Sequence, residues 1–168
     1  MLSFIVAGLP RSGTTWVANW LTTDNTLCIH DPLYKYTLEE LDRLQTDKLL
    51  GISCTGLWEY PKFLQEHKAR KIILHRDLKD VNDSLVNEIE TNPISEDKAK
   101  VLDSIDGMHV QFNDLFNPDT AKTVYEYALN KPFDPVRHAY LVEMNIQPNF
   151  GMLFVNKEVL RNFKQRIV

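Results

Sequence analysis

The sequence predicts a three-layer α/β/α fold with a central, mainly parallel, five-stranded sheet. Short apolar runs alternate along the chain with stretches of helical periodicity, which is the pattern of strands joined by crossover helices. A glycine-containing loop between Gly8 and Thr15 separates the first apolar run from the first helical stretch. The 168 residues contain no repeat, no low-complexity tract and no long linker, so we expect residues 1–168 to form a single domain.

Each predicted strand is a short apolar run of a length suited to a sheet. The first, Ser3–Ala7, is mostly apolar without alternation, which is typical of a strand that is buried on both faces. Helical stretches separate this run from the others, so the strands that follow it are expected to be parallel to it. We expect those strands at Thr26–Ile29, Leu49–Cys54, Lys71–Leu74 and Met108–Phe112.

The helices are predicted from their caps and from their apolar periodicity. Thr37 and Glu40 have the spacing of a capping box ahead of one helix. Asn-Pro and Asp-Pro pairs at 117–118 and 134–135 are typical openings of two more helices. The remaining helices are expected over residues 13–21, 61–67, 79–90, 96–104 and 157–166.

The composition excludes several classes of protein. The formal net charge of -4 argues against a general nucleic-acid binder, which is usually basic, so no nucleic-acid partner is expected. No apolar run approaches the ~20 residues that span a bilayer, and Phe4–Leu9 is too short for the core of a signal peptide. We therefore expect a cytoplasmic protein with no membrane partner. Cys28 and Cys54 fit no metal spacing, so we expect reduced, half-buried thiols and no metal.

The loop from Gly8 to Thr15 reads Gly-Leu-Pro-Arg-Ser-Gly-Thr-Thr. A glycine, four residues and a second glycine, between a strand and a helix, form the frame of the phosphate-binding loop in P-loop NTPase-like folds. Glycines allow a tight turn, and the backbone N–H groups with the helix N-terminus attract an anion. Thr14 stands where nucleotide triphosphatases have a lysine, and the cation lies inside the loop at Arg11. The loop therefore predicts a nucleotide-like ligand. The cation inside the loop would contact a different part of this ligand from the part that the lysine contacts.

The segment from Pro10 to Trp16 resembles the P-[KR]-S-G-T-T-W loop of the sulfotransferases that use 3′-phosphoadenosine 5′-phosphosulfate (PAPS). The resemblance implies that PAPS is the co-substrate, without a metal, and that the loop holds its 5′-phosphosulfate. It also implies a catalytic role for Arg11, which would neutralise charge on the sulfuryl group and on the oxygen that leaves. The residues that the resemblance assigns to PAPS binding here are Pro10, Arg11, Ser12, Gly13, Thr14, Thr15 and Trp16.

A second segment, from Arg76 to Ser84, resembles the R-[ND]-P-[KR]-D-V-x-x-S motif of the same family. The resemblance implies that Arg76 and Ser84 bind the 3′-phosphate of PAPS. The chemistry agrees, because an arginine fork at the carboxyl end of a parallel strand suits a phosphate and a serine adds a hydroxyl donor. Leu78 replaces the proline that is usual in the family, which changes the turn and leaves the two ligands in place.

A third segment, Val110–Leu115 followed by Asn117 and Pro118, resembles a late strand and "E-D-L…P" stretch of these enzymes. It supports the fold, and we expect Asp114 to be a structural acceptor. The three matches occur in the family's order between Ser3 and Pro135. Such a short version would suit a bacterium or a phage.

The general base is left open by the resemblance. Animal cytosolic members have a histidine after the third strand, and here that place holds Cys54 to Glu59, which contains no histidine. Other branches use a carboxylate just after the second strand, where this chain has His30 and Asp31. Either could take a proton from an acceptor, although a capping or packing role for His30 is equally consistent. Glu59 is the reserve candidate, and His75 is expected to pack at its strand end.

The sequence thus predicts transfer of a sulfuryl group from PAPS to a hydroxyl or amine acceptor. One alternative is a small-molecule or nucleotide kinase that uses ATP and Mg²⁺. Thr14 in the lysine position and the lack of a strand-end aspartate for Mg²⁺ count against it. The other alternative is a non-catalytic protein that binds PAPS or its product 3′-phosphoadenosine 5′-phosphate (PAP). The acceptor and the oligomeric state are open.

Overall fold

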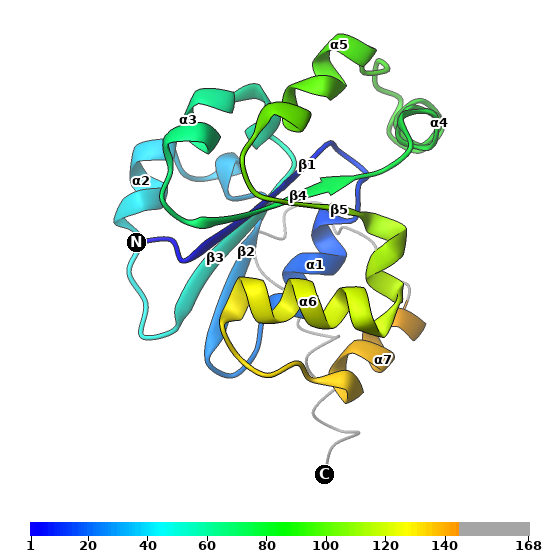
Figure 1. The fold of residues 1–168 in the computed structure, drawn as a ribbon. Helices are drawn as coiled ribbons and strands as arrows, with labels where there is room; N and C mark the ends of the chain where they lie inside the picture. Colours follow the sequence, from blue (N-terminus) through cyan, green and yellow to red (C-terminus); the bar gives the residue numbers. More distant parts are fainter. Residues whose placement is uncertain (145–168) are drawn as a thin grey trace.

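The computed structural model describes residues 1–144, which contain one sheet of five parallel strands (Figure 1). The predicted α/β class is confirmed, and every pairing is parallel. The helix expected at 157–166 lies outside the described residues. The strand order is β2-β3-β1-β4-β5, with β1 in the centre. The strands are β1 (Phe4–Gly8), β2 (Thr26–His30), β3 (Leu49–Cys54), β4 (Arg70–His75) and β5 (Met108–Gln111).

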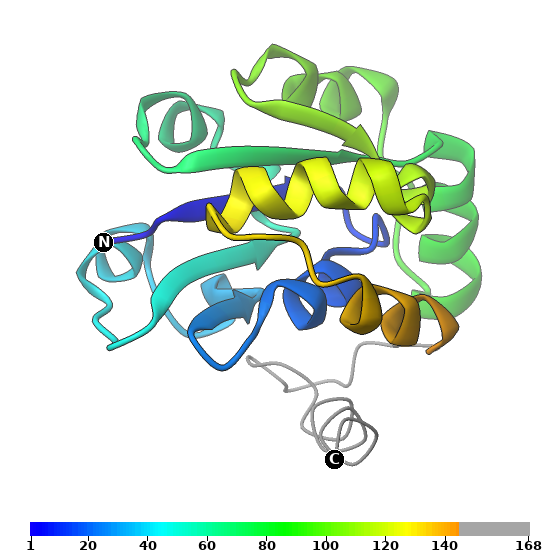
Figure 2. The same ribbon diagram turned by 60° about the horizontal axis from the view of Figure 1, so that its bottom comes forward.

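Helices cover both faces of the sheet and complete the three layers (Figures 1 and 2). One face carries α1 (Thr14–Leu21), α6 (Pro118–Leu129) and α7 (Pro135–Glu143). The other face carries α2 (Leu38–Arg43), α3 (Pro61–Glu66), α4 (Leu78–Ile89) and α5 (Glu96–Ala99). Short 3₁₀ helices occupy Pro32–Tyr34, Leu57–Glu59, Lys100–Ser104 and Phe112–Phe116.

Strand β1 is central because both of its faces are apolar. Phe4 and Val6 pack into the core beneath α1 and α6, whereas Ile5 and Ala7 pack into the core beneath the opposite helices. All four side chains are fully buried. Burial of one large aliphatic or aromatic side chain contributes roughly 1.5–3 kcal/mol, so this strand anchors both layers of the core.

The caps that the sequence predicts are present in the structure. The Thr37 hydroxyl accepts the N–H of Glu40, and the Glu40 carboxylate accepts the N–H of Thr37 at 2.8 Å, which completes the capping box of α2. Asn117 accepts from the N–H of Asp119 at the start of α6. The Asp134 carboxylate accepts from the N–H of Arg137 at the start of α7. These side chains satisfy N–H groups that have no partner within their helices.

Two local expectations were wrong. The helix expected at 96–104 is split into α5 and the 3₁₀ helix Lys100–Ser104, because this stretch buries only Leu102 and has no continuous apolar face to hold it helical. Cys28 and Cys54 are fully buried rather than half-buried. Burial raises the pKa of the Cys54 thiol to about 12, with a further contribution from the Asp31 carboxylate.

No helix among residues 1–144 is long and apolar enough to cross a membrane.

Gly51 of β3 is predicted to be a packing requirement of the central sheet. A Cβ at this position would lie 2.1 Å from the Phe4 ring, which belongs to the paired residue of β1. We expect Gly51→Ala to lower the free energy of unfolding by about 1–3 kcal/mol in urea denaturation, because the buried ring has no space to move. Gly56→Ala is the control, since its nearest neighbour would be 3.3 Å away and its backbone φ is -86°. Equal effects of the two changes would contradict this packing argument.

Candidate functional site

The loop between β1 and α1 lies at the carboxyl end of the central strand, where ligands bind in parallel α/β sheets. Two of its residues have left-handed backbone conformations, Arg11 with φ 66° and Gly13 with φ 85°. The N–H of Ser12 donates to the carbonyl oxygen of Leu9 at 3.1 Å and closes the turn. A Cβ on Gly13 would lie 2.1 Å from the ring of Phe112, so both conformation and space require glycine there.

The N-terminus of α1 faces this turn without a protein cap. Gly13 provides no capping side chain, and the first turn of α1 has no acidic residue. The first N–H groups of a helix have no partners within it and carry a partial positive charge. The Ser12 hydroxyl is buried and has no hydrogen-bond partner among the residues that the structure describes. These donors make the loop suited to an anion.

The Arg11 side chain extends from the loop to α4. Its Nε donates to the Ser84 hydroxyl at 2.7 Å, and its terminal Nη2 forms an ion pair with Glu88. Arg76, just after β4, donates from Nη1 to the carbonyl oxygen of Arg11 at 2.6 Å. The structure therefore brings Arg11, Arg76 and Ser84 together across 65 to 73 residues of sequence. At this edge of the loop the Arg11 side chain thus contacts Ser84, and the Arg76 side chain contacts the Arg11 backbone.

Glu88 is a site residue that the sequence analysis missed. It lies four residues after Ser84 on α4, so both side chains lie on the same face of that helix. The spacing from Ser84 was the available signal, but nothing in the sequence indicated that this face meets Arg11. In the structure the Glu88 carboxylate offsets the positive charge of Arg11.

His30 and Asp31, the predicted bases, lie on the opposite side of the loop, at the end of β2. Nε2 of His30 is 3.1 Å from the Thr15 hydroxyl, 3.3 Å from the Thr14 hydroxyl and 3.3 Å from Oδ2 of Asp31. The other carboxylate oxygen of Asp31 accepts the N–H and the hydroxyl of Thr55, at 2.6 and 3.0 Å. These five side chains form one network that fixes the threonines of the loop.

The His30 imidazole is nearly buried, with 8% of the residue exposed. This burial lowers its pKa below the ordinary value, and the Asp31 carboxylate opposes the shift. Asp31 also has a left-handed backbone with φ 43°, which directs the chain from β2 into the next turn. His30 is therefore held by its neighbours and has little open surface toward a ligand.

The remaining predicted residues lie apart from this cluster. Trp16 is buried, and its indole N–H donates to the carbonyl oxygen of Leu141 on α7 at 2.9 Å. Its ring contacts other aromatic rings, including Phe112 and Phe116, so its observed contacts are those of a core residue. Glu59 is exposed on a 3₁₀ helix. Among residues 1–144, no group of three or more acidic, histidine or cysteine side chains could hold a metal ion.

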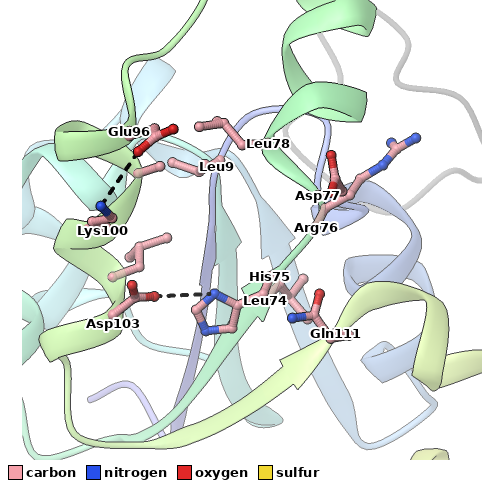
Figure 3. Close-up of a pocket in the computed structure, with 12 residues that line it drawn as sticks. Leu9, Leu74, His75, Arg76, Asp77, Leu78, Glu96, Lys100, Asp103 and Gln111 are labelled. Atoms are coloured by element: carbon pink, nitrogen blue, oxygen red, sulfur yellow. Dashed lines mark ion pairs between the residues drawn. The ribbon is translucent and has the colours of Figure 1, made fainter.

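An open cleft of about 440 Å³ adjoins the loop on the face of the sheet that carries α5. The loop residue Leu9 forms part of its wall, as do Arg76 and Asp77 after β4 (Figure 3). His75 and Asp103 face each other within it. The cleft therefore adjoins the loop between β1 and α1.

The strand order and the helices on both faces define a parallel, three-layer α/β protein with a glycine-framed loop between its central strand and a helix. No family model and no curated protein matches the chain. Among solved structures, the chain is similar to a gluconokinase from Sinorhizobium meliloti 1021. The similarity has a TM-score of 0.41 and 14% sequence identity and covers 84% of this chain and 94% of that one.

Replacement of Glu88 is predicted to strengthen anion binding at the loop. In Glu88→Gln the Arg11 guanidinium loses its counter-charge, so inorganic pyrophosphate should bind up to about 5-fold more tightly, the range expected for a partly exposed ion pair. Isothermal titration calorimetry at constant ionic strength measures this change. Asp83→Asn is the control, because Asp83 lies on the same helix and pairs with Lys79. A Glu88→Gln affinity no higher than that of Asp83→Asn would contradict the prediction.

Proposed function

We propose that the protein transfers a sulfuryl group from PAPS to a hydroxyl or amine acceptor. The observation that carries this proposal is the cluster of Arg11, Arg76 and Ser84 beside a phosphate-binding loop that lacks the lysine of nucleotide triphosphatases. PAPS carries two anionic groups, a 5′-phosphosulfate and a 3′-phosphate. The site offers a donor set for each of them.

The 5′-phosphosulfate would lie on the backbone N–H groups of the loop and on the N-terminus of α1. Arg11 would turn from Glu88 to the sulfuryl oxygens, where its charge offsets the charge that develops during transfer. Arg76 and Ser84 would bind the 3′-phosphate and so position the donor for in-line attack. The acceptor atom forms a bond to sulfur while the bond from sulfur to the 5′-phosphate oxygen breaks, and PAP leaves with that electron pair.

His30 and Asp31 would act on the donor side by orienting the loop. The contacts of Nε2 of His30 with both threonine hydroxyls support a positioning role, in which Thr14 and Thr15 present their hydroxyl groups to the phosphosulfate. Asp31 would in turn fix the imidazole, as it is itself fixed by Thr55. This proposal differs from the general-base role that the sequence analysis considered for these two residues.

A kinase that uses ATP and Mg²⁺ is the competing function, and fewer residues at the loop support it. Strand β3, the neighbour of β1 on one side, ends in Ser53 and Cys54 and provides no carboxylate for Mg²⁺. The Ser53 hydroxyl instead donates to the carbonyl oxygen of Thr14 at 2.8 Å. A protein that binds PAP without catalysis is the second alternative, and it shares the same donor site.

The 3′-phosphate contact gives a direct test of this function. We expect Arg76→Ala to weaken PAP binding roughly 10- to 100-fold, the effect of one charge-assisted hydrogen bond or ion pair to a phosphate. Binding of adenosine 5′-monophosphate, which lacks the 3′-phosphate, should change by less than about 3-fold. Calorimetry with both nucleotides measures the difference. Arg43→Ala is the control, because Arg43 is exposed on α2 and pairs with Glu39.

Two results would contradict the proposal. If the wild-type protein binds ATP–Mg²⁺ more tightly than PAP, the kinase function is favoured. If Arg76→Ala weakens the binding of both adenosine nucleotides equally, Arg76 acts only by supporting the backbone of Arg11 and does not bind the 3′-phosphate.

A further inference from the structure

The cleft beside the loop contains a histidine whose protonation is fixed by its neighbours. Nε2 of His109 lies 2.8 Å from the carbonyl oxygen of Ile105, which only accepts, so this nitrogen carries the hydrogen. In neutral His109 the Nδ1 atom is then an acceptor, and it lies 2.8 Å from Nε2 of His75. Nε2 of His75 must therefore donate. Nδ1 of neutral His75 is left with a free electron pair, which makes it a base.

This free nitrogen faces the cleft together with one carboxylate. Nδ1 of His75 lies 3.7 Å from Oδ1 of Asp103, on the far wall of the cleft (Figure 3). A proton taken up at Nδ1 would thus be stabilised by an adjacent negative charge, as a general base requires. Burial lowers the pKa of His75 below its ordinary value, His109 lowers it further and Asp103 opposes the shift, so the surroundings favour the neutral imidazole.

The walls of the cleft indicate the kind of molecule that fits. The apolar part consists of leucine side chains from the loop, from β4, from α4 and from the 3₁₀ helix, with one alanine of α5. The polar rim has both signs of charge, and Lys100 is paired with Glu96 (Figure 3). A volume of about 440 Å³ suits a small compound. The apolar residues are Leu9, Leu74, Ala99, Leu78 and Leu102, and the charged residues besides His75 are Arg76, Asp77, Glu96, Lys100 and Asp103.

We propose that this cleft is the acceptor site, that it takes a neutral hydroxyl compound with an apolar body, and that His75 is the general base. The proposal rests on the proposed sulfuryl transfer. The acceptor hydroxyl gives its proton to Nδ1 of His75, and its oxygen forms the bond to sulfur. The bond from sulfur to the 5′-phosphate oxygen breaks, and PAP leaves with the electron pair. Asp103 stabilises the imidazolium, and His109 holds the ring by the hydrogen bond to Nε2.

The protonation pattern is testable without any ligand. In a ¹⁵N-labelled full-length protein at pH 7.5, long-range ¹⁵N–¹H correlation spectra should show His75 with hydrogen on Nε2 and none on Nδ1. His109→Gln removes the Nδ1 acceptor and should change this pattern. A wild-type His75 that carries its hydrogen on Nδ1 would overturn the proposal, because it would then have no base facing the cleft.

Occupation of the cleft is tested with 2-naphthol as the probe. We expect 2-naphthol, added to protein saturated with PAP, to shift the NMR signals of His75 and Leu102. Ala99→Trp fills the cleft and should weaken the effect at least 10-fold, whereas Ser104→Trp, an exposed position on the neighbouring 3₁₀ helix, should leave it unchanged. Shifts confined to other regions, no shifts, or competition between PAP and 2-naphthol for the cleft would each contradict an acceptor site.

The base itself is tested by turnover of PAPS with 2-naphthol. His75→Gln should lower kcat about 100-fold or more, within the usual range for loss of a general base, and leave PAP affinity unchanged. The wild-type kcat should fall as the pH drops through the lowered pKa of His75, since only the neutral imidazole accepts a proton. An unchanged kcat in His75→Gln would overturn the assignment. Failure of PAP to bind the wild type would instead reject the proposed function, while the protonation pattern, and the shifts caused by 2-naphthol in the absence of PAP, would still test the cleft.

Discussion

The turn from β1 into α1 is the constraint on which the rest of the site depends. Gly13 has a left-handed backbone and its Cα is covered by the ring of Phe112, so the turn is held between the loop and the segment after β5. The turn leaves the N-terminus of α1 uncapped and directs the Arg11 side chain toward α4. A different turn would displace both the start of α1 and the Arg11 side chain. The fully apolar β1 places this turn at the centre of the sheet.

Each side of the loop is supported by a different strand end. On the β2 side, His30 and Asp31 hold the hydroxyls of Thr14 and Thr15. On the β4 side, Arg76 donates a hydrogen bond to the carbonyl oxygen of Arg11. The cleft lined by His75 lies beside Arg76. The site is thus divided into a buried network that fixes the loop and an open side with room for a second molecule. The proposed sulfuryl transfer would use this arrangement, with the donor on the loop and the acceptor in the adjoining cleft.

The sequence predicted the fold well because its signals are local. Apolar runs, the capping box of Thr37 and Glu40, and the Asn-Pro and Asp-Pro helix starts each act within a few residues, and the structure contains all of them. Arg76 and Ser84, which the sequence also singled out, each contact Arg11, Ser84 at the Arg11 side chain and Arg76 at the Arg11 backbone carbonyl. The 3₁₀ helix Lys100–Ser104 was missed because a single buried leucine, rather than a periodic face, holds it.

The parts of the site that the sequence did not predict are contacts between segments that lie far apart along the chain. Nothing near Glu88 in the sequence indicates Arg11, and nothing near His75 indicates His109 or Asp103, which come from β5 and from a 3₁₀ helix. A strand-end histidine has the same local pattern whether it packs in a core or faces a cleft. Only the arrangement of its hydrogen bonds distinguishes the two, and that arrangement depends on tertiary structure.

A crystal structure of the full chain with PAP measures the central claim most directly. If the loop and the guanidinium cluster form a PAPS site, the 5′-phosphate will lie on the N–H groups at the start of α1. The 3′-phosphate will lie within hydrogen-bond distance of Arg76 and Ser84, and Arg11 will have left Glu88. A 3′-phosphate exposed to solvent, or a nucleotide bound away from the loop, would contradict the claim.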